Sequence, residues 1–270
     1  MFNADAKTVQ RMAPMMQRVL ILDQQPASVR LLTELLRDIS NCQVWTAPES
    51  RQGLALAERV NPHIIFVEQS PGLDGIAFTR KLRRSEFHCR KAPVIMVTSE
   101  ATAAVILGAR DAGAHEFLRK PYMIKDLMRR LEAVTLRGRD WVEAVGYIGP
   151  DRRRFNSGDY SGPLKRGQDS TETPEEARII QALKILKSAV GSIDFEPQQA
   201  LRAMLAQARE LQAAAASIKD PRLGLAAGSL QKRLLAASKG ALPKAELQAS
   251  LAELWDCMPR EGESRGAAAA

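Results

Sequence analysis

Four side chains that can do chemistry stand at the ends of short apolar runs in the first half of the chain. They are Asp23, Glu68, Thr98 and Lys120. The runs before them are rich in β-branched and other apolar residues, which is typical of buried strands. The carboxyl ends of parallel strands meet at one edge of an open α/β sheet, and sites are built at that edge. We therefore expect these four polar groups to converge; the alternative is ordinary helix capping and surface polarity.

Apolar runs and helical stretches alternate five times over this half of the chain. The expected strands are residues 18–22, 44–47, 64–68, 93–98 and 116–118. The expected helices, which begin at a proline or show apolar residues at helical spacing, are residues 26–39, 48–60, 76–84, 105–112 and 124–134. This alternation favours a parallel sheet that is covered by helices on both faces. The predicted fold class is therefore α/β.

Two stretches carry a resemblance to a known family, VIMVTSE at residues 94–100 and GAHEFLRKP at residues 113–121. With them, residues 18–135 resemble the receiver domain of bacterial response regulators. The resemblance implies a CheY-like fold of the flavodoxin type with strand order 2-1-3-4-5.

The resemblance also implies a site. In the family, an acidic pair after the first strand and an aspartate after the third strand hold Mg²⁺, and the aspartate accepts a phosphoryl group. Thr98 and Lys120 match the residues that contact this group, and Phe117 matches the aromatic switch position. The Lys120–Pro121 bond is expected to be cis, an isomer that is rare outside such sites.

The sequence departs from the family pattern at three places that carry the chemistry. The acidic pair is Asp23-Gln24, the phosphoacceptor position is Glu68, and the loop from Glu68 to Gly75 is one residue shorter than usual. Mg²⁺ binds mainly through carboxylates in near-octahedral geometry, so these changes weaken its site. The extra methylene of glutamate shifts an attacking oxygen by about 1 Å, which costs on the order of 10²-fold in a positioned reaction. We therefore predict that this domain accepts no phosphate and binds Mg²⁺ weakly or not at all.

Glu68 has two interpretations at this point. Its longer side chain is able to reach Lys120 and Thr98 and pair with them, which would lock the domain in an active-like state. Alternatively, Glu68 only neutralises Lys120, because a buried ammonium group without a partner is costly, and the fold is a static docking block.

Arginine, aromatic and turn residues dominate the segment 136–173, where the apolar periodicity stops. Its candidate ligand-binding residues are Arg139, Arg152, Arg153, Arg154, Lys165 and Arg166. Guanidinium groups bind phosphates in bidentate fashion and stack on bases. The arrangement is similar to CheY-like proteins that carry an arginine-rich extension and bind cyclic di-GMP. A solvated linker is the other interpretation.

Helix starts recur in the second half of the chain, at Pro174, Pro197, Pro221 and Pro243. Each is followed by an apolar stripe, which for the third helix includes Leu225, Leu230 and Leu234. Residues 174–257 are therefore expected to form a small helical bundle for interaction or dimerisation. The bundle is not a histidine phosphotransfer module, because His115 is the last histidine of the chain.

The composition limits the cellular location, the disulfide and metal sites and the partners that can be expected. No apolar run reaches the ~18–20 residues of a membrane span, and no signal-peptide core is present, so we expect a cytoplasmic protein. Three scattered cysteines give neither a disulfide framework nor a metal site, and His63, His88 and His115 are expected at the surface. Residues 1–17 are expected to be a loose arm or a short helix, and residues 258–270 a disordered tail. The net charge of +8 suits an acidic partner without choosing one.

The sequence predicts a signalling protein rather than an enzyme, because it shows no nucleophile–base pair and no metal cluster. The preferred prediction is an atypical response regulator, a pseudo-receiver that acts as an adaptor without phosphorylation. It would bind signalling proteins through its receiver face or its helical part, and a homodimer is compatible with the bundle. Three alternatives stay open: a cyclic di-GMP effector, a DNA-binding regulator, and a still-active phosphoreceiver in a phosphorelay. Nucleic acid is not the expected partner, since no helix-turn-helix with a basic second helix is apparent.

Overall fold

The computed structural model describes residues 6–152, 174–237 and 244–257. The chain divides into two compact units. The first unit comprises Met1–Val142 and Tyr147–Pro163, and the second comprises Glu143–Gly146 and Leu164–Ala270.

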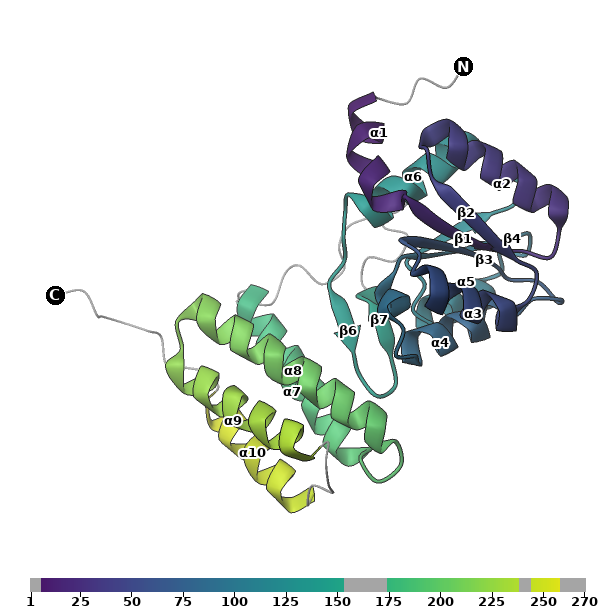
Figure 1. The fold of residues 1–270 in the computed structure, drawn as a ribbon. Coiled ribbons are helices and arrows are strands. Elements are labelled where there is room, and N and C mark those ends of the chain that lie inside the picture. Colours follow the sequence, from purple (N-terminus) through teal and green to yellow (C-terminus); the bar gives the residue numbers. More distant parts are fainter. Residues whose placement is uncertain (1–5, 153–173, 238–243, 258–270) are drawn as a thin grey trace. The chain divides into compact units, whose positions relative to one another are not determined.

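A five-stranded parallel sheet forms the centre of the first unit (Figure 1). Its strands are β1 (Arg18–Leu22), β2 (Gln43–Ala47), β3 (Ile64–Glu68), β4 (Val94–Thr98) and β5 (Glu116–Arg119), and their order is β2-β1-β3-β4-β5. Every residue of β3 and β4 is buried, as expected for central strands of a sheet with two covered faces. The predicted fold class and strand order are confirmed.

Helices cover both faces of this sheet. The helices α2 (Pro26–Ile39) and α6 (Ile124–Thr135) pack on one face, and α3 (Ser50–Val60), α4 (Gly75–Arg84) and α5 (Ala103–Asp111) pack on the other (Figure 1). A short 3-10 turn, η2 (His88–Lys91), precedes β4. Because successive side chains of a strand point to opposite faces, Val19 and Ile21 enter one core while Leu20 and Leu22 enter the other.

The N-terminal residues add to the first of these cores. Within the described residues from 6 onwards, the short helix is observed rather than a loose arm, as α1 (Ala6–Met12) followed by the 3-10 turn η1 (Ala13–Met16). Met12 and Met16 are 0% exposed and pack among the residues of α2 and α6, whereas Met15 is 50% exposed. Methionine suits this role, because its flexible side chain fills irregular gaps in a core.

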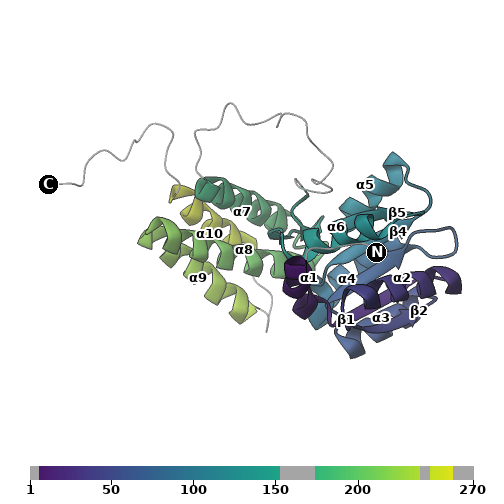
Figure 2. The ribbon, with the colours of Figure 1, turned by 90° about the horizontal axis from the view of Figure 1, so that it is seen from above.

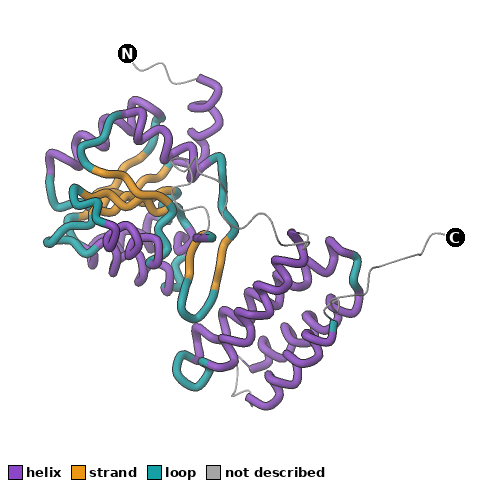
Figure 3. Tube along the Cα trace, turned by 180° about the vertical axis from the view of Figure 1, so that it is seen from behind, coloured by secondary structure: helices purple, strands orange, loops and turns teal. Residues whose placement is uncertain are grey.

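A second, small sheet follows α6. It pairs β6 (Trp141–Glu143) with β7 (Ile148–Pro150), drawn as two orange strands in Figure 3. The sequence analysis did not foresee these two strands, because it found no apolar periodicity in this segment. Strands of three residues are too short for alternation of polar and apolar side chains to be recognised.

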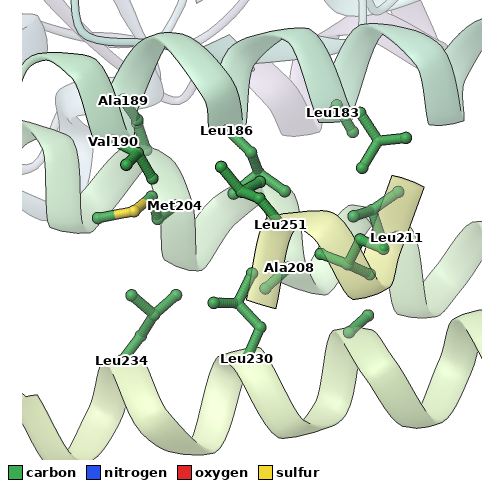
Figure 4. Packing of buried hydrophobic residues seen from close by; sticks show 14 of the residues in the cluster. Leu183, Leu186, Ala189, Val190, Met204, Ala208, Leu211, Leu230, Leu234 and Leu251 are labelled. Carbon is green, nitrogen blue, oxygen red and sulfur yellow. The ribbon is translucent and has the colours of Figure 1, made fainter. Parts of the chain in front are cut away.

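In the part of the second unit that the structure describes, four helices lie side by side (Figure 2). They are α7 (Pro174–Gly191), α8 (Pro197–Ile218), α9 (Pro221–Ala237) and α10 (Lys244–Asp256). Buried leucines and alanines of these helices build one core, part of which is shown in Figure 4. The predicted helical bundle is therefore confirmed. Among the described residues, no helix is both long and apolar enough to cross a membrane.

The apolar stripe of α9 differs from the prediction. Leu225 is 75% exposed, and the buried stripe is Leu223, Ala227, Leu230 and Leu234. These four residues are spaced by three or four positions, whereas Leu225 is two positions from Leu223 and so lies on another side of the helix. The expected tail at residues 258–270 lies outside the described residues.

The buried N-terminal methionines lead to a stability prediction. Replacing Met16 by alanine removes a fully buried side chain and leaves a cavity, so we expect the free energy of unfolding to fall by about 2–4 kcal/mol. The matched control is Met15→Ala at the half-exposed neighbour, which should cost much less. Urea denaturation followed by circular dichroism measures both; equal losses would contradict the assignment of Met16 to the core.

Candidate functional site

The carboxyl edge of the large sheet brings the four predicted side chains to one place. Glu68 and Thr98 are the last residues of β3 and β4, and Asp23 and Lys120 directly follow β1 and β5. The residue register keeps the ends of these four strands level with one another. The Lys120–Pro121 peptide is cis, as the resemblance implied.

One ammonium group joins two carboxylates at this edge. Lys120 Nζ lies 2.6 Å from Glu68 Oε1 and 2.8 Å from Asp23 Oδ2, so it donates a hydrogen bond to each. Glu68 is 5% exposed and Asp23 is 8% exposed, whereas the Lys120 side chain is 17% exposed. Such ion pairs, close and largely withdrawn from water, are screened far less than surface pairs.

The other oxygens of the two carboxylates also have donors. Asp23 Oδ1 accepts from the backbone N–H of Gln25 at 2.8 Å. Glu68 Oε2 accepts a longer bond from the Ser70 hydroxyl at 3.4 Å. All four carboxylate oxygens are thus engaged by N–H or O–H groups of the protein, which satisfies the usual requirement of buried polar atoms.

The environment of Lys120 changes its pKa. Burial alone would lower the pKa of this ammonium group, but the hydrogen bonds and charges of Asp23 and Glu68 outweigh burial and raise it above its ordinary value of 10.5. A group whose pKa is raised on folding stabilises the protein fully below its unfolded value, and this contribution is lost as the pH rises through the folded value. Lys120 is therefore charged at neutral pH.

Thr98 is not part of the ion cluster, so the pairing with Glu68 that one of the two interpretations requires is not observed. The Thr98 hydroxyl donates to the backbone oxygen of Gln69 at 2.7 Å and accepts from the N–H of Glu100 at 3.1 Å. Both partners are backbone groups next to the strand ends, so they satisfy the threonine locally. Phe117, the predicted switch residue, is buried at 4% exposure on β5.

The short loop after β3 is shaped by two glycines. A Cβ atom on Gly75 would lie 2.4 Å from the Glu68 backbone oxygen, so the chain returns too closely for any other residue. A Cβ atom on Gly72 would lie 2.0 Å from the Gln24 side-chain oxygen, so the Gln24 amide packs directly against this loop. The Asp74 side chain then caps α4 by accepting from the Ala77 N–H at 2.9 Å.

These residues do not fit a magnesium ion. Mg²⁺ needs oxygen ligands in near-octahedral geometry. Here, however, both oxygens of Asp23 are already hydrogen-bonded, Glu68 is bonded to Lys120, and the Gln24 oxygen lies against Gly72. Among the described residues, no group of three or more His, Cys, Asp or Glu side chains is arranged to hold a metal ion.

Two of the predicted ligand-binding arginines are engaged within the first unit. Arg139 donates to the backbone oxygens of Asp151 and His115. Arg152 lies over the Tyr147 ring at 4.2 Å and forms an ion pair of 3.0 Å with Asp111. The other four, Arg153, Arg154, Lys165 and Arg166, lie outside the described residues.

A second cluster, which the sequence analysis missed, surrounds Arg83 at the end of α4. Arg83 is 1% exposed, and His115, Trp141 and Tyr147 lie near it. A sequence signal for part of this cluster exists. The heptapeptide YIGPDRR at residues 147–153 is followed by the similar YSGPLKR at residues 160–166. In the first copy, the Tyr147 hydroxyl donates to the Pro150 backbone oxygen at 2.5 Å.

Comparison with known proteins agrees with a receiver-domain fold. The family model of the response regulator receiver domain matches residues 19–132. The chain is 30% identical over 118 residues to a probable chemotaxis protein CheY of Rhizobium etli, a match that covers 43% of this chain and 91% of that protein. It is 31% identical over 120 residues to Protein PilH of Pseudomonas aeruginosa, covering 44% of this chain and 98% of that protein.

One solved structure and two further relatives have lower sequence identity to this chain. The structure of the chemotaxis response regulator CheY4 of Vibrio cholerae is 24% identical, with a TM-score of 0.39, and the match covers 44% of this chain and 98% of that one. Two further relatives, RpaA of Synechocystis sp. and MtrA of Mycolicibacterium smegmatis, are DNA-binding regulators, and the chain spans 50% and 55% of their lengths.

The chain belongs to the response regulator receiver family, the class of two-component signalling proteins that its sheet order and carboxyl-edge site define. The family model ends at residue 132, before β6, so it includes neither the small sheet nor the helical unit.

The ion cluster leads to a prediction about Lys120. Lys120→Met leaves two buried carboxylates without their shared cation, so we expect the free energy of unfolding at neutral pH to fall by about 2–4 kcal/mol. Lys125→Met, at an exposed lysine of α6, is the matched control and should be nearly neutral. Adding Glu68→Gln to Lys120→Met should recover part of the loss, because it removes one of the two unpaired charges. Equal urea midpoints for the two lysine variants would contradict the prediction.

Proposed function

We propose that this protein is a response regulator whose receiver domain signals without phosphorylation. The observation that carries the proposal is the 2.6 Å ion pair between Glu68 and Lys120. In the family that the sequence resembles, the lysine contacts a phosphoryl group on an aspartate. Here, the lysine already has two carboxylates as partners, and the position of that aspartate is occupied by one of them.

The geometry favours one of the two interpretations of Glu68. A mimic of the phosphorylated state would engage both Lys120 and Thr98. Glu68 engages Lys120, which it shares with Asp23, while the Thr98 hydroxyl is bonded to Gln69. We therefore propose that Glu68 neutralises the site and that the receiver domain is a constitutive docking block for protein partners. The helical unit is the second candidate surface for such partners.

Phosphorylation by acetyl phosphate tests the proposal. The purified chain is incubated with acetyl phosphate and Mg²⁺, and its intact mass is measured. We expect no phosphoryl adduct, because the attacking carboxylate is bonded to Lys120 and the metal ligands are engaged. A CheY protein that accepts phosphate is treated in parallel to show that the reagents work.

A variant sharpens this test. Gln24→Asp combined with Glu68→Asp restores the family's carboxylates without changing the loop length. If this double variant acquires the adduct and the natural chain does not, the two substitutions are the reason for the loss. Stoichiometric modification of the natural chain would contradict the proposal.

A further inference from the structure

Arg83 carries a positive charge that is held entirely by neutral atoms. Its guanidinium group donates to the backbone oxygens of Gly113, Arg90 and Ala92 at distances between 2.6 and 3.0 Å. It also contacts His115 Nδ1 at 3.2 Å. None of these described partners is a carboxylate, and burial lowers the pKa of Arg83 to about 9. A buried cation without a counter-ion is costly, so the surrounding cluster is poorly disposed to accept more positive charge.

Residues at the start of β6 contact the cluster around Arg83. The Trp141 ring lies 5.3 Å from the Arg83 guanidinium carbon and 5.6 Å from Lys91 Nζ, and its centroid is 6.4 Å from that of His115. Arg139, just before β6, donates to the His115 backbone oxygen. These contacts place His115 beside residues 139–142, which together with residues 147–150 of the same unit we call the strap.

Close backbone approach completes the attachment. Gly113 has a φ of +92°, and a Cβ atom there would lie 2.4 Å from the Ile148 oxygen. A Cβ atom on Gly149 would lie 2.7 Å from the Gly113 Cα atom. The strap therefore lies directly on the turn between α5 and β5, and His115 is the second residue after the glycine of that turn.

The contacts of His115 fix its protonation state. Its Nδ1 atom faces two donors, Arg83 Nη2 at 3.2 Å and the backbone N–H of Val94 at 3.3 Å. A nitrogen that accepts from N–H groups has no proton of its own, so the ring is neutral with its hydrogen on Nε2. Protonation of Nδ1 would break both bonds and add a positive charge beside Arg83 and Arg139.

The charged and titratable groups around His115 do not offset such a charge. The cations that act on His115 are Arg83 of α4 and Arg139. Of the η2 cations, Arg90 donates to the Arg83 backbone oxygen, and Lys91 lies over the Trp141 ring. On the anionic side, the Glu116 carboxylate of β5 pairs with Arg130 at 3.2 Å, and Asp151 follows β7. The Tyr147 hydroxyl is neutral, because burial raises its pKa to about 12. Burial first, and then the charges of Arg83 and Arg139, hold the pKa of His115 well below its ordinary value of 6.5.

We propose that His115 is an acid-sensitive latch that holds the strap on the first unit, and that its protonation releases the strap. Proton binding favours release of the strap, because a released strap exposes a histidine that binds a proton more readily than the docked one. The contribution of His115 to the stability of the docked strap is therefore complete above pH 6.5. It is lost as the pH falls through the lower pKa that His115 has in the docked state. The inference stands on the Arg83 cluster alone and does not depend on the phosphorylation proposal.

Fluorescence of Trp141 tests the latch in the full chain. Changing Trp45 and Trp255 to phenylalanine leaves Trp141 as the only tryptophan. Quenching by acrylamide is then measured from pH ~8 to pH ~4, with far-UV circular dichroism on the same samples. We expect quenching to rise severalfold with a midpoint below 6.5, while the circular dichroism signal stays constant.

Matched histidine variants identify the titrating group. His115→Asn places an amide oxygen near the position of Nδ1, where it accepts the same bonds but does not titrate in this range. It should abolish the midpoint, whereas His88→Asn, at an exposed histidine, should leave it unchanged. Unchanged quenching in the parent chain would overturn the proposal, as would a rise that only accompanies loss of circular dichroism. The same midpoint in His115→Asn would also overturn it, and the parent result decides if that variant does not fold.

Discussion

The carboxyl edge of the sheet depends on one ammonium group that two carboxylates share. Asp23 and Glu68 are brought there by β1 and β3, and Lys120 reaches them from the end of β5. Two buried carboxylates at adjacent strand ends would repel each other and lack the hydration they have in water. The lysine removes both problems, so the geometry of the edge and the presence of this cation are inseparable.

The residues around the cluster complete its hydrogen bonds and pack against its loop. Ser70 and the Gln25 backbone satisfy the outer carboxylate oxygens, and Gln24 packs against the loop at Gly72. A chemically active receiver would need open metal ligands and an unbonded attacking oxygen. The edge has a closed set of hydrogen bonds, which supports the proposal that partners recognise this surface without modifying it.

The sequence predicted the sheet of the first unit and the side chains at its carboxyl edge, because the ends of the strands can be recognised in the sequence. Apolar runs that stop at Asp23, Glu68 and Lys120 are enough to place these side chains at one edge, given a parallel sheet. The fate of Thr98 was not predictable in the same way, because its partner is the backbone oxygen of Gln69 rather than a side chain. Any polar side chain near a turn has such local alternatives, and only the folded geometry shows which one wins.

Arg83 and His115 show a second limit to what the sequence can predict. Arginine near the end of a helix normally lies in water, and scattered histidines are normally at the surface, yet Arg83 is 1% exposed and the His115 ring accepts two hydrogen bonds. His115 is half-buried in the structure rather than exposed as expected. The partners of Arg83 are carbonyl groups of residues 90, 92 and 113, which leave no mark in the sequence. The short strands that cover this cluster were missed for a similar reason, since their pairing depends on where the chain returns.

The carboxyl edge depends most on the ammonium group that Asp23 and Glu68 share, and nitrogen-15 NMR of the lysine ammonium groups measures its pKa directly. A pH titration of the Lys120 signal, assigned with Lys120→Met, should give a pKa above 10.5 in the natural chain and a lower one in Glu68→Gln. A Lys120 pKa at or below 10.5 that does not respond to Glu68→Gln would contradict the account.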